Sequence, residues 1–208
     1  GQHRARSSIG CQRLIDTGLN QLPLRYMDAG AESVVTGTRL ITGETLHQEV
    51  IEEQVRCAKS YVWIATADLK DMHVRAGRRY KPILDVFDEL AADGVGLRIV
   101  HSALPSRPFR ATLEEYPRLT GGALELQICP RSHWKMVIVD GRFGYCGSAN
   151  FTGAGLGAKS ARKRNLEVGV VSDSPIWVSQ LEQLFDEFWV GSYCDDCAFR
   201  SQCPDPVR

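Results

Sequence analysis

The sequence predicts an α/β domain built on a mixed β-sheet that is flanked by helices. Short continuous apolar runs, such as residues 61–66 and 96–100, are typical of buried parallel strands. Segments with the helical spacing of apolar residues alternate with these runs, which is the order of an α/β domain. A length of 208 residues suits one main domain, and 43% hydrophobic with 24% charged residues indicates a globular chain.

Composition excludes some classes of protein. The 25 Lys and Arg residues equal the 25 Asp and Glu residues, so bulk charge does not hold this chain to nucleic acid. No apolar run reaches the roughly 20 residues that a membrane helix needs, and no secretory signal is visible. Seven cysteines are an odd number for a disulfide framework, which favours a reducing, cytoplasmic location.

Periodicity divides the chain into three segments. Residues 1–33 are polar with weak periodicity, and we interpret them as an N-terminal extension. Residues 34–190 carry the regular pattern of the predicted domain. Residues 191–208 form a cysteine-rich C-terminal tail.

The first half of the domain alternates strands with helices. In chain order, we expect a strand at 34–41, a helix from 43 to about 58, a strand at 61–66, a polar basic loop at 70–81, a helix at 82–92 and a strand at 96–100. Leu46, Val50, Ile51 and Val55 define the apolar face of the first helix, and Gly94 ends the second.

The second half is richer in strands. In chain order, we expect a loop at 101–108, a helix at 109–119, strands at 124–128, 134–139, 143–146 and 166–171, and a helix at 175–189. The pair Asp140-Gly141 predicts the turn between two of these strands. Ser174 is the expected cap of the last helix, with Pro175 at its first position.

The segment from 132 to 150 carries the chemistry. Side chains alternate along a strand, so His133 and Lys135 point to the same side. A lysine neutralises a phosphate, and a histidine with a pKa near 6.5 acts as nucleophile or as acid and base. Gly147 lets the backbone turn tightly, and Ser148 and Asn150 supply donors for phosphate oxygens.

These residues resemble the signature of the phospholipase D superfamily. That signature is H-x-K, four residues, D, six residues, and then G-S-x-N. The chain has it without a gap, at His133, Lys135, Asp140, Gly147, Ser148 and Asn150. The resemblance implies a phospholipase D-like fold and hydrolysis of phosphodiesters through a phosphohistidine, with no metal or other cofactor in catalysis.

The resemblance also implies a homodimer. The family's usual site needs two H-x-K motifs, and this chain has one, at His133. A two-fold axis would bring His133 and Lys135 of both subunits into one pocket. By the same resemblance, Glu167 is the acidic residue that orients His133. Asp140 belongs to the catalytic signature, and we expect it to fix the end of its strand rather than to touch the substrate.

The motif alone does not choose between nucleic acids and phospholipids as substrate. A basic run on the loop after the motif favours a nuclease acting on DNA or RNA, because these cations can follow a phosphate backbone. Its candidate substrate-binding residues are Lys159, Arg162, Lys163 and Arg164. No amphipathic membrane helix is evident, so we expect no stable membrane association. The alternatives are a cardiolipin hydrolase or phosphatidyl transferase, and a non-catalytic nucleic-acid-binding module.

Three cysteines crowd the C-terminus with the spacing C-x2-C-x5-C-P. They are Cys194, Cys197 and Cys203, close enough in sequence to share a metal centre. The trio resembles that of RecB-type iron–sulfur nucleases, which implies a structural 4Fe-4S cluster completed by one upstream cysteine, here Cys11. Zinc, with Cys11 or a histidine such as His3, is the alternative, and so are free or disulfide-bonded thiols.

Overall fold

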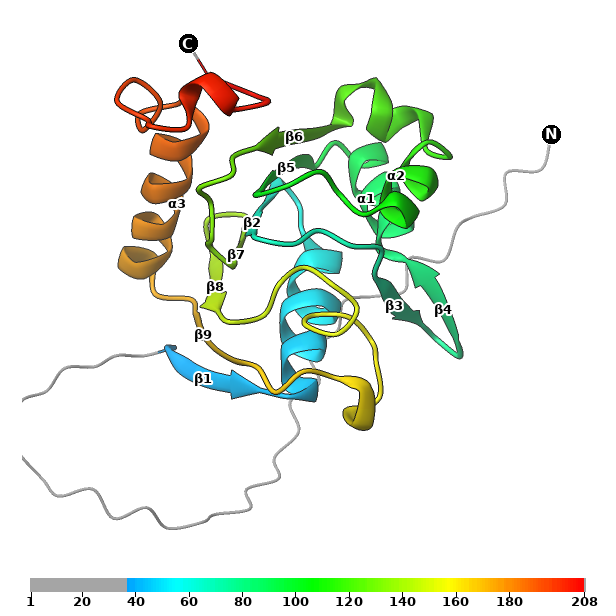
Figure 1. The fold of residues 1–208 in the computed structure, drawn as a ribbon. Helices are drawn as coiled ribbons and strands as arrows, with labels where there is room; N and C mark the ends of the chain where they lie inside the picture. Colours follow the sequence, from blue (N-terminus) through cyan, green and yellow to red (C-terminus); the bar gives the residue numbers. More distant parts are fainter. Residues whose placement is uncertain (1–36, 208) are drawn as a thin grey trace, which may run out of the picture. The chain divides into compact units, whose positions relative to one another are not determined.

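A seven-stranded mixed β-sheet runs through the computed structural model, which describes residues 37–207 (Figure 1). The order of its strands is β1-β9-β8-β7-β2-β5-β6. These strands are β1 (Arg39–Thr42), β2 (Tyr61–Thr66), β5 (Gly96–His101), β6 (Leu124–Ile128), β7 (Met136–Val139), β8 (Phe143–Gly147) and β9 (Val168–Ser172). A separate hairpin pairs β3 (His73–Ala76) with β4 (Arg79–Pro82).

The sheet changes direction at β7. Strands β2, β5 and β6 pair in parallel, whereas β7 pairs antiparallel with β2 and with β8. Strands β9 and β1 extend this antiparallel half. The predicted α/β class with a mixed sheet is therefore confirmed. The connections determine these strand directions: helices connect the parallel strands, whereas a short turn connects the antiparallel strands β7 and β8.

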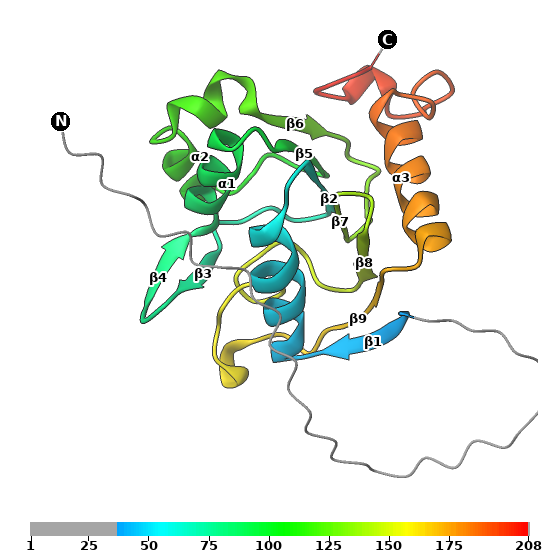
Figure 2. The ribbon, with the colours of Figure 1, turned by 180° about the vertical axis from the view of Figure 1, so that it is seen from behind.

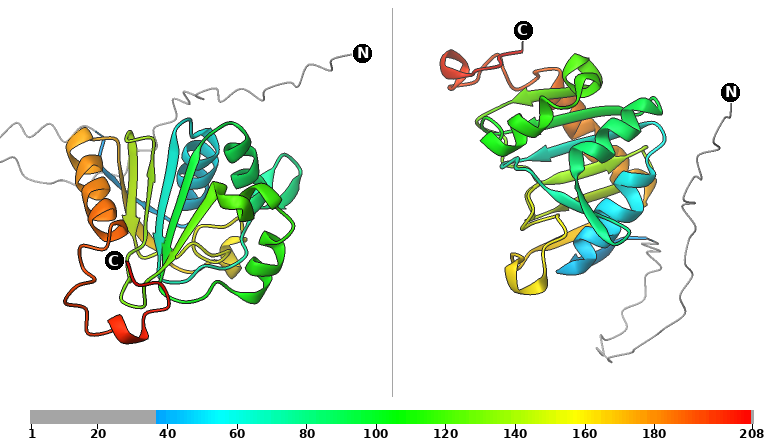
Figure 3. Two further views of the ribbon diagram at one scale, coloured as in Figure 1. Left: turned by 90° about the horizontal axis from the view of Figure 1, so that it is seen from above. Right: turned by 90° about the vertical axis from the view of Figure 1, so that its right-hand side faces the viewer.

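Helices cover both faces of the sheet (Figures 2 and 3). In chain order they are η1 (Leu46–Gln54), η2 (Val55–Cys57), α1 (Ile83–Ala92), α2 (Arg107–Leu113), η3 (Leu119–Ala123), η4 (Ala161–Lys163), α3 (Pro175–Trp189) and η5 (Arg200–Gln202). The larger core lies between the sheet and the side of η1 and α1, with buried residues such as Leu46, Ile64 and Phe87. The smaller core lies under α3, where Phe185 packs with Met136 and Ile138.

Several element boundaries differ from the sequence prediction. The basic stretch 70–81 contains the β3–β4 hairpin rather than a loop. The predicted helix 109–119 divides into α2 and η3, because Pro117 cannot continue the hydrogen bonding of α2. Strand β7 begins at Met136 instead of Trp134. Ser174 is at the N-cap position of α3 as predicted, but its side chain makes no capping hydrogen bond.

Some predictions lie outside the described residues. They are the N-terminal extension and its Cys11, together with the first part of the strand expected at 34–41. The C-terminal tail belongs to the same compact unit as the rest of residues 37–207. It is joined to the sheet by the backbone N–H of Ile128, which donates to the Asp205 carboxylate at 3.2 Å.

Asp140 closes the turn after β7 and ties it to β2. Its carboxylate accepts hydrogen bonds from the backbone amides of Lys59, Ser60 and Tyr61 at 2.7–3.1 Å. The pKa of Asp140 is lowered: burial opposes the charged form, and these amides with the Arg142 guanidinium more than offset it. Its left-handed backbone, with φ 54°, is a conformation that Asp tolerates better than most residues.

We expect Asp140→Asn to reduce the free energy of unfolding by about 1–3 kcal/mol at pH 7, because charge-assisted bonds to amides are lost. A lowered folded-state pKa means that this stabilisation is present above the ordinary carboxylate pKa and is lost as the pH falls. The difference from the wild type should therefore shrink below roughly pH 4. Urea unfolding at pH 7 and at pH 3 measures both values.

The matched control is Asp93→Asn, at the exposed end of α1. It should change stability by less than about 0.5 kcal/mol, as surface substitutions usually do. An equal loss at both positions, or a loss at Asp140 that does not depend on pH, would contradict the role given to this carboxylate.

Candidate active site

His133 and Lys135 lie in the loop that enters β7. The Lys135 Nζ atom is 3.3 Å from Nδ1 of His133 and donates to the His133 carbonyl oxygen at 2.8 Å. The imidazole is exposed, while the lysine is half-buried. Burial lowers the pKa of Lys135, and the charge of Glu167 opposes this shift. An ammonium and an imidazole are thus held together at the open end of the sheet.

The pairing of β7 with β8 brings the second half of the motif to the same place. Met136 is opposite Cys146, and the Gly147 amide donates to the Lys135 carbonyl at 3.0 Å. Gly147 has no positive φ, so the tight turn predicted for it is wrong. The position needs glycine for another reason: a Cβ there would lie 2.6 Å from the Val168 carbonyl oxygen and from the Tyr145 hydroxyl.

Asn150 is fixed by its carbonyl end. Its Oδ1 atom accepts from the backbone amides of Ala67 and Asp68 at 3.1 and 3.2 Å and from the Thr66 hydroxyl at 3.3 Å. These donors belong to the end of β2 and the turn after it. Among residues 37–207, the amide nitrogen of Asn150 has no hydrogen-bond acceptor. It remains available to donate to an anion.

Glu167 lies just before β9, at the position expected for it. Its carboxylate accepts from the Ser148 hydroxyl and, at 3.0 Å, from the Asn165 amide. The Ser148 amide donates to the Val168 carbonyl at 3.0 Å, and the Ser148 hydroxyl accepts from the Val168 amide at 3.1 Å. Within the part of the chain that the structure describes, Glu167 makes no hydrogen bond to His133. The carboxylate instead binds Ser148 and acts on Lys135 through its charge.

Asp140 is not part of this group. The whole of β7 separates it from Lys135, and its carboxylate is occupied by three backbone amides at the other end of the strand. Asp140, at the turn between β7 and β8, is therefore a structural residue. This agrees with the role that the sequence analysis preferred for it.

The four basic side chains of residues 159–164 do not share one environment. Lys159, Arg162 and Lys163 are exposed on the loop between the motif and β9. Arg164 instead turns back, and its guanidinium donates to the carbonyl oxygens of Lys159 and Gly155 at 3.0 and 3.4 Å. Three cations of this run can meet a polyanion, and the fourth holds the loop in shape.

The group forms an anion site with one imidazole. Lys135 can supply a charge, and Asn150, which follows β8, can supply a neutral donor to an anion. The His133 ring can attack an electrophile or transfer a proton, but one ring cannot do both to the two ends of one bond. This group therefore contains one of the two acid–base groups that such a reaction needs.

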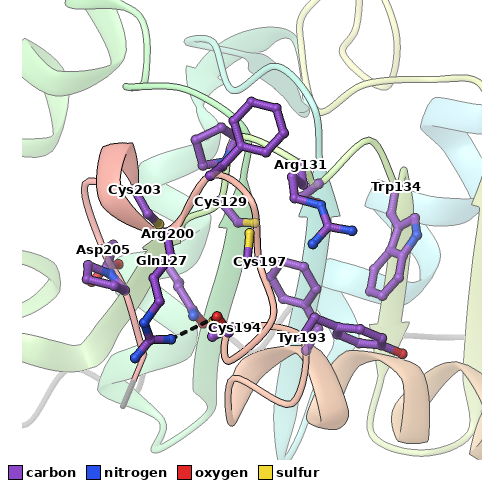
Figure 4. A pocket seen from close by; sticks show the side chains of 15 residues that line it. Gln127, Cys129, Arg131, Trp134, Tyr193, Cys194, Cys197, Arg200, Cys203 and Asp205 are labelled. Atoms are coloured by element: carbon purple, nitrogen blue, oxygen red, sulfur yellow. Dashed lines mark hydrogen bonds between the residues drawn. The ribbon is translucent and has the colours of Figure 1, made fainter.

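A separate cavity of about 260 Å³ lies beside the motif loop, between β6, the end of α3 and the C-terminal segment (Figure 4). Its lining includes the trio Cys194, Cys197 and Cys203 that the sequence singled out. It also includes Cys129, which is not among the metal ligands predicted from the sequence. Its position directly after the predicted strand 124–128 could have indicated that Cys129 lies at the edge of the sheet. The other proposed partner, Cys11, lies outside the described residues.

Comparison with known families supports the reading of the motif. A family model described as "Cardiolipin synthase, PLD-like domain" matches residues 51–189. A search of curated protein sequences finds no match. Among residues 37–207, no helix has the length and apolar character that crossing a bilayer demands.

Solved structures with the same fold share little sequence with this chain. NucT from Helicobacter pylori is 16% identical, with a TM-score of 0.53, over 73% of this chain and 94% of that one. TrmBL2, an archaeal chromatin protein, is 17% identical, with a TM-score of 0.50 over 76% of this chain, which spans only 54% of TrmBL2. Nuc, a phospholipase D family member from Salmonella typhimurium, is 18% identical, with a TM-score of 0.48 over 82% of this chain and 99% of that one.

We expect Asn150→Asp to distinguish the structural role of the side-chain oxygen from the binding role of the amide nitrogen. The variant keeps the acceptor for Thr66, Ala67 and Asp68, so its melting temperature should stay within a few degrees of the wild type. Its second oxygen repels an anion, so inorganic phosphate should bind at least about tenfold more weakly. Calorimetric titration with phosphate and thermal melting measure the two effects.

The comparison variant is Asn150→Ala, which leaves three donors without an acceptor. It should lose about 1–3 kcal/mol of stability as well as phosphate affinity. Unchanged phosphate binding in Asn150→Asp would show that the amide nitrogen does not face the anion site.

Proposed function

Because this chain belongs to the PLD-like domain family of the phospholipase D superfamily, we propose that it is a phosphodiesterase acting as a homodimeric, metal-independent nuclease. The observation that carries the proposal is the contact of Lys135 with His133, 3.3 Å between Nζ and Nδ1, beside the free amide of Asn150. This group offers a nucleophile and two donors for the charge on a phosphodiester.

The proposed reaction has two displacements at phosphorus. A nitrogen of the His133 ring attacks, the P–O bond to the leaving group breaks, and the partner subunit's His133 protonates the departing oxygen. Water then attacks the phosphohistidine, gives its proton to that second ring, and the P–N bond breaks. Lys135 and Asn150 stabilise the charge on the phosphoryl oxygens in both steps.

An uncovered apolar face beside the site supports the dimer. Leu40, Val170 and Cys146 lie next to one another by strand pairing, and Val168 follows on the same face. Helix α3 covers this face at Gly144 but not at Cys146 and Val168, which are exposed. Leu40 is 71% exposed. Apolar side chains gathered at one edge of a site favour a subunit contact.

The cations beside the site favour nucleic acid as the substrate. Lys159, Arg162 and Lys163 project from the loop that leaves the motif. A polyanion longer than the site can contact such side chains, whereas a single phospholipid head group does not need them.

Two other functions have an observation in their favour. The matched family model names a cardiolipin synthase, which favours a lipid hydrolase or a phosphatidyl transferase. TrmBL2 is described as binding DNA, which favours a binding module without turnover. The presence of His133 and Lys135 in contact argues against the binding module, since recognition of a phosphate does not need a nucleophile.

We expect the purified protein to cleave single-stranded DNA or RNA in the presence of EDTA, and His133→Asn to lose at least about 10³-fold in rate. A phosphohistidine, whose P–N bond is labile in acid but stable in alkali, should be trapped when the wild type is denatured at alkaline pH during turnover. Cardiolipin vesicles serve as the rival substrate in the same buffer. Turnover of lipid without cleavage of nucleic acid, or equal rates for His133→Asn and the wild type, would reject the proposal.

We expect Val168→Asp to give a folded monomer with little activity, because a charge replaces an apolar group at the proposed contact. Ile176→Asp, at another exposed apolar position, on α3, is the control that should remain dimeric and active. Light scattering and the cleavage assay report the two properties.

A mixing experiment tests the shared site without any interface variant. Equal amounts of wild type and His133→Asn, exchanged to equilibrium, should retain about one quarter of the activity of the same total amount of wild type. Retention of one half would indicate that each subunit works alone.

A further inference from the structure

Four of the seven cysteines line the cavity beside the motif loop. Three of them, Cys194, Cys197 and Cys203, come from the C-terminal segment, and Cys129 comes from the end of β6. All four are half-buried free thiols. Figure 4 shows the sulfur atoms of Cys129 and Cys197 directed toward each other. Thiols with this access are ligands for a soft metal.

We propose that these four thiols bind one metal centre, which is either a zinc ion or an iron–sulfur cluster. Both take four cysteine thiolates, and both accept a pair with C-x2-C spacing. The fourth ligand is then Cys129 rather than Cys11. The centre is structural, since it lies outside the anion site of Lys135 and Asn150.

The backbone of the C-terminal segment already has the turns that such a centre needs. The Cys197 amide donates to the Cys194 carbonyl at 3.3 Å, and the Arg200 amide donates to the Cys197 carbonyl at 3.0 Å. The Cys203 amide donates in turn to the Arg200 carbonyl at 3.3 Å. Successive turns of this kind bring the three thiols to one side of the segment.

The same segment lacks an apolar core of its own. None of residues 190–207 is buried, although the segment follows a defined path along α3 and β6. Ordering a chain costs conformational entropy, and buried apolar area usually offsets that cost. Short segments without such area use a metal or a disulfide instead.

The charges around the cavity fit four thiolates. With a divalent ion, four thiolates leave a net charge of about −2, and an iron–sulfur centre is also anionic. Arg131 and Arg200 line the cavity and supply two positive charges. The Arg131 guanidinium contacts the Cys197 thiol, and Arg200 donates to the Cys194 carbonyl at 2.9 Å.

The thiols share a cavity but are not yet gathered around one point. Among residues 37–207, no three His, Cys, Asp or Glu side chains are close enough to hold an ion as they stand. Metal binding must therefore draw the half-exposed C-terminal turns toward Cys129, with release of the thiol protons. The cavity provides the space for that closure.

Closure would act on the motif loop. Cys129 is four residues before His133, and its carbonyl accepts from the Ser132 amide at 2.9 Å while its own amide donates to His101 at 2.8 Å. A metal bond at Cys129 would fix the start of the loop that carries the nucleophile. It would hold the C-terminal segment against that loop at the same time.

The test is the metal content of the full chain purified without oxygen. We expect about one zinc ion, or about four iron atoms with equal acid-labile sulfide, per chain. X-ray absorption of the wild type should give four sulfur ligands per metal. Removal of the metal should increase amide exchange in residues 190–207, which is a readout that does not depend on activity.

Serine variants identify the fourth ligand. Cys129→Ser should retain less than about one tenth of the metal, whereas Cys11→Ser and Cys146→Ser should retain all of it. Cys146 is the matched control because it is a free, exposed cysteine outside the cavity.

Three results would overturn the proposal. They are absence of both metals, disulfide bonds among the four thiols, and loss of metal in Cys11→Ser but not in Cys129→Ser. Because the sulfur count is made on the wild type, a variant that fails to fold does not remove the test.

Discussion

The register of the β7–β8 hairpin determines where the side chains of the candidate active site lie. Met136 is opposite Cys146, and the next bond joins the Gly147 amide to the Lys135 carbonyl. This register places His133 and Lys135, which precede β7, beside Ser148 and Asn150, which follow β8. A slip of one residue would turn each side chain to the other face of the sheet and separate the imidazole from its donors.

The neighbouring strands preserve this register in different ways. At one end of β7, the Asp140 carboxylate binds three amides at the start of β2. At the other end, Asn150 binds three donors that follow β2. The two ends of β2 therefore fix both ends of the hairpin. One of these side chains is structural, and the other also presents an amide to the anion site.

The sequence predicted most of this arrangement because the information is local. The H-x-K spacing is enough to place His133 near Lys135, although both lie in the loop before β7 and not on a strand as predicted. The helical stripe of 175–189 gives the bounds of α3. The sequence could not predict the role of Gly147, because the carbonyl of Val168 that excludes a side chain is distant in the chain. The β3–β4 hairpin was missed because each of its strands has only four residues, so the alternation of buried Val74 with exposed His73 and Arg75 is too brief to stand out in a basic stretch.

Cys129 was missed for a related reason. Its neighbours in sequence are the strand β6 and the motif, so local pattern assigns it to a core segment. Its neighbours in space come from a segment more than sixty residues away, and only the fold shows the cavity that they share. Spacing within 194–203 indicates that three thiols belong together, but a fourth partner from another element carries no local signature.

The motif loop depends on constraints from outside itself. Residues 129–135 belong to no strand, and His133 is exposed, so packing alone does not hold the ring. The loop is fixed at its end by the bond from Gly147 to Lys135 and at its start by the bond from Cys129 to His101. A side chain on a loop between two such anchors keeps its position only if both anchors are rigid. The hairpin supplies one rigid anchor, and a centre at Cys129 would supply the other without entering the anion site.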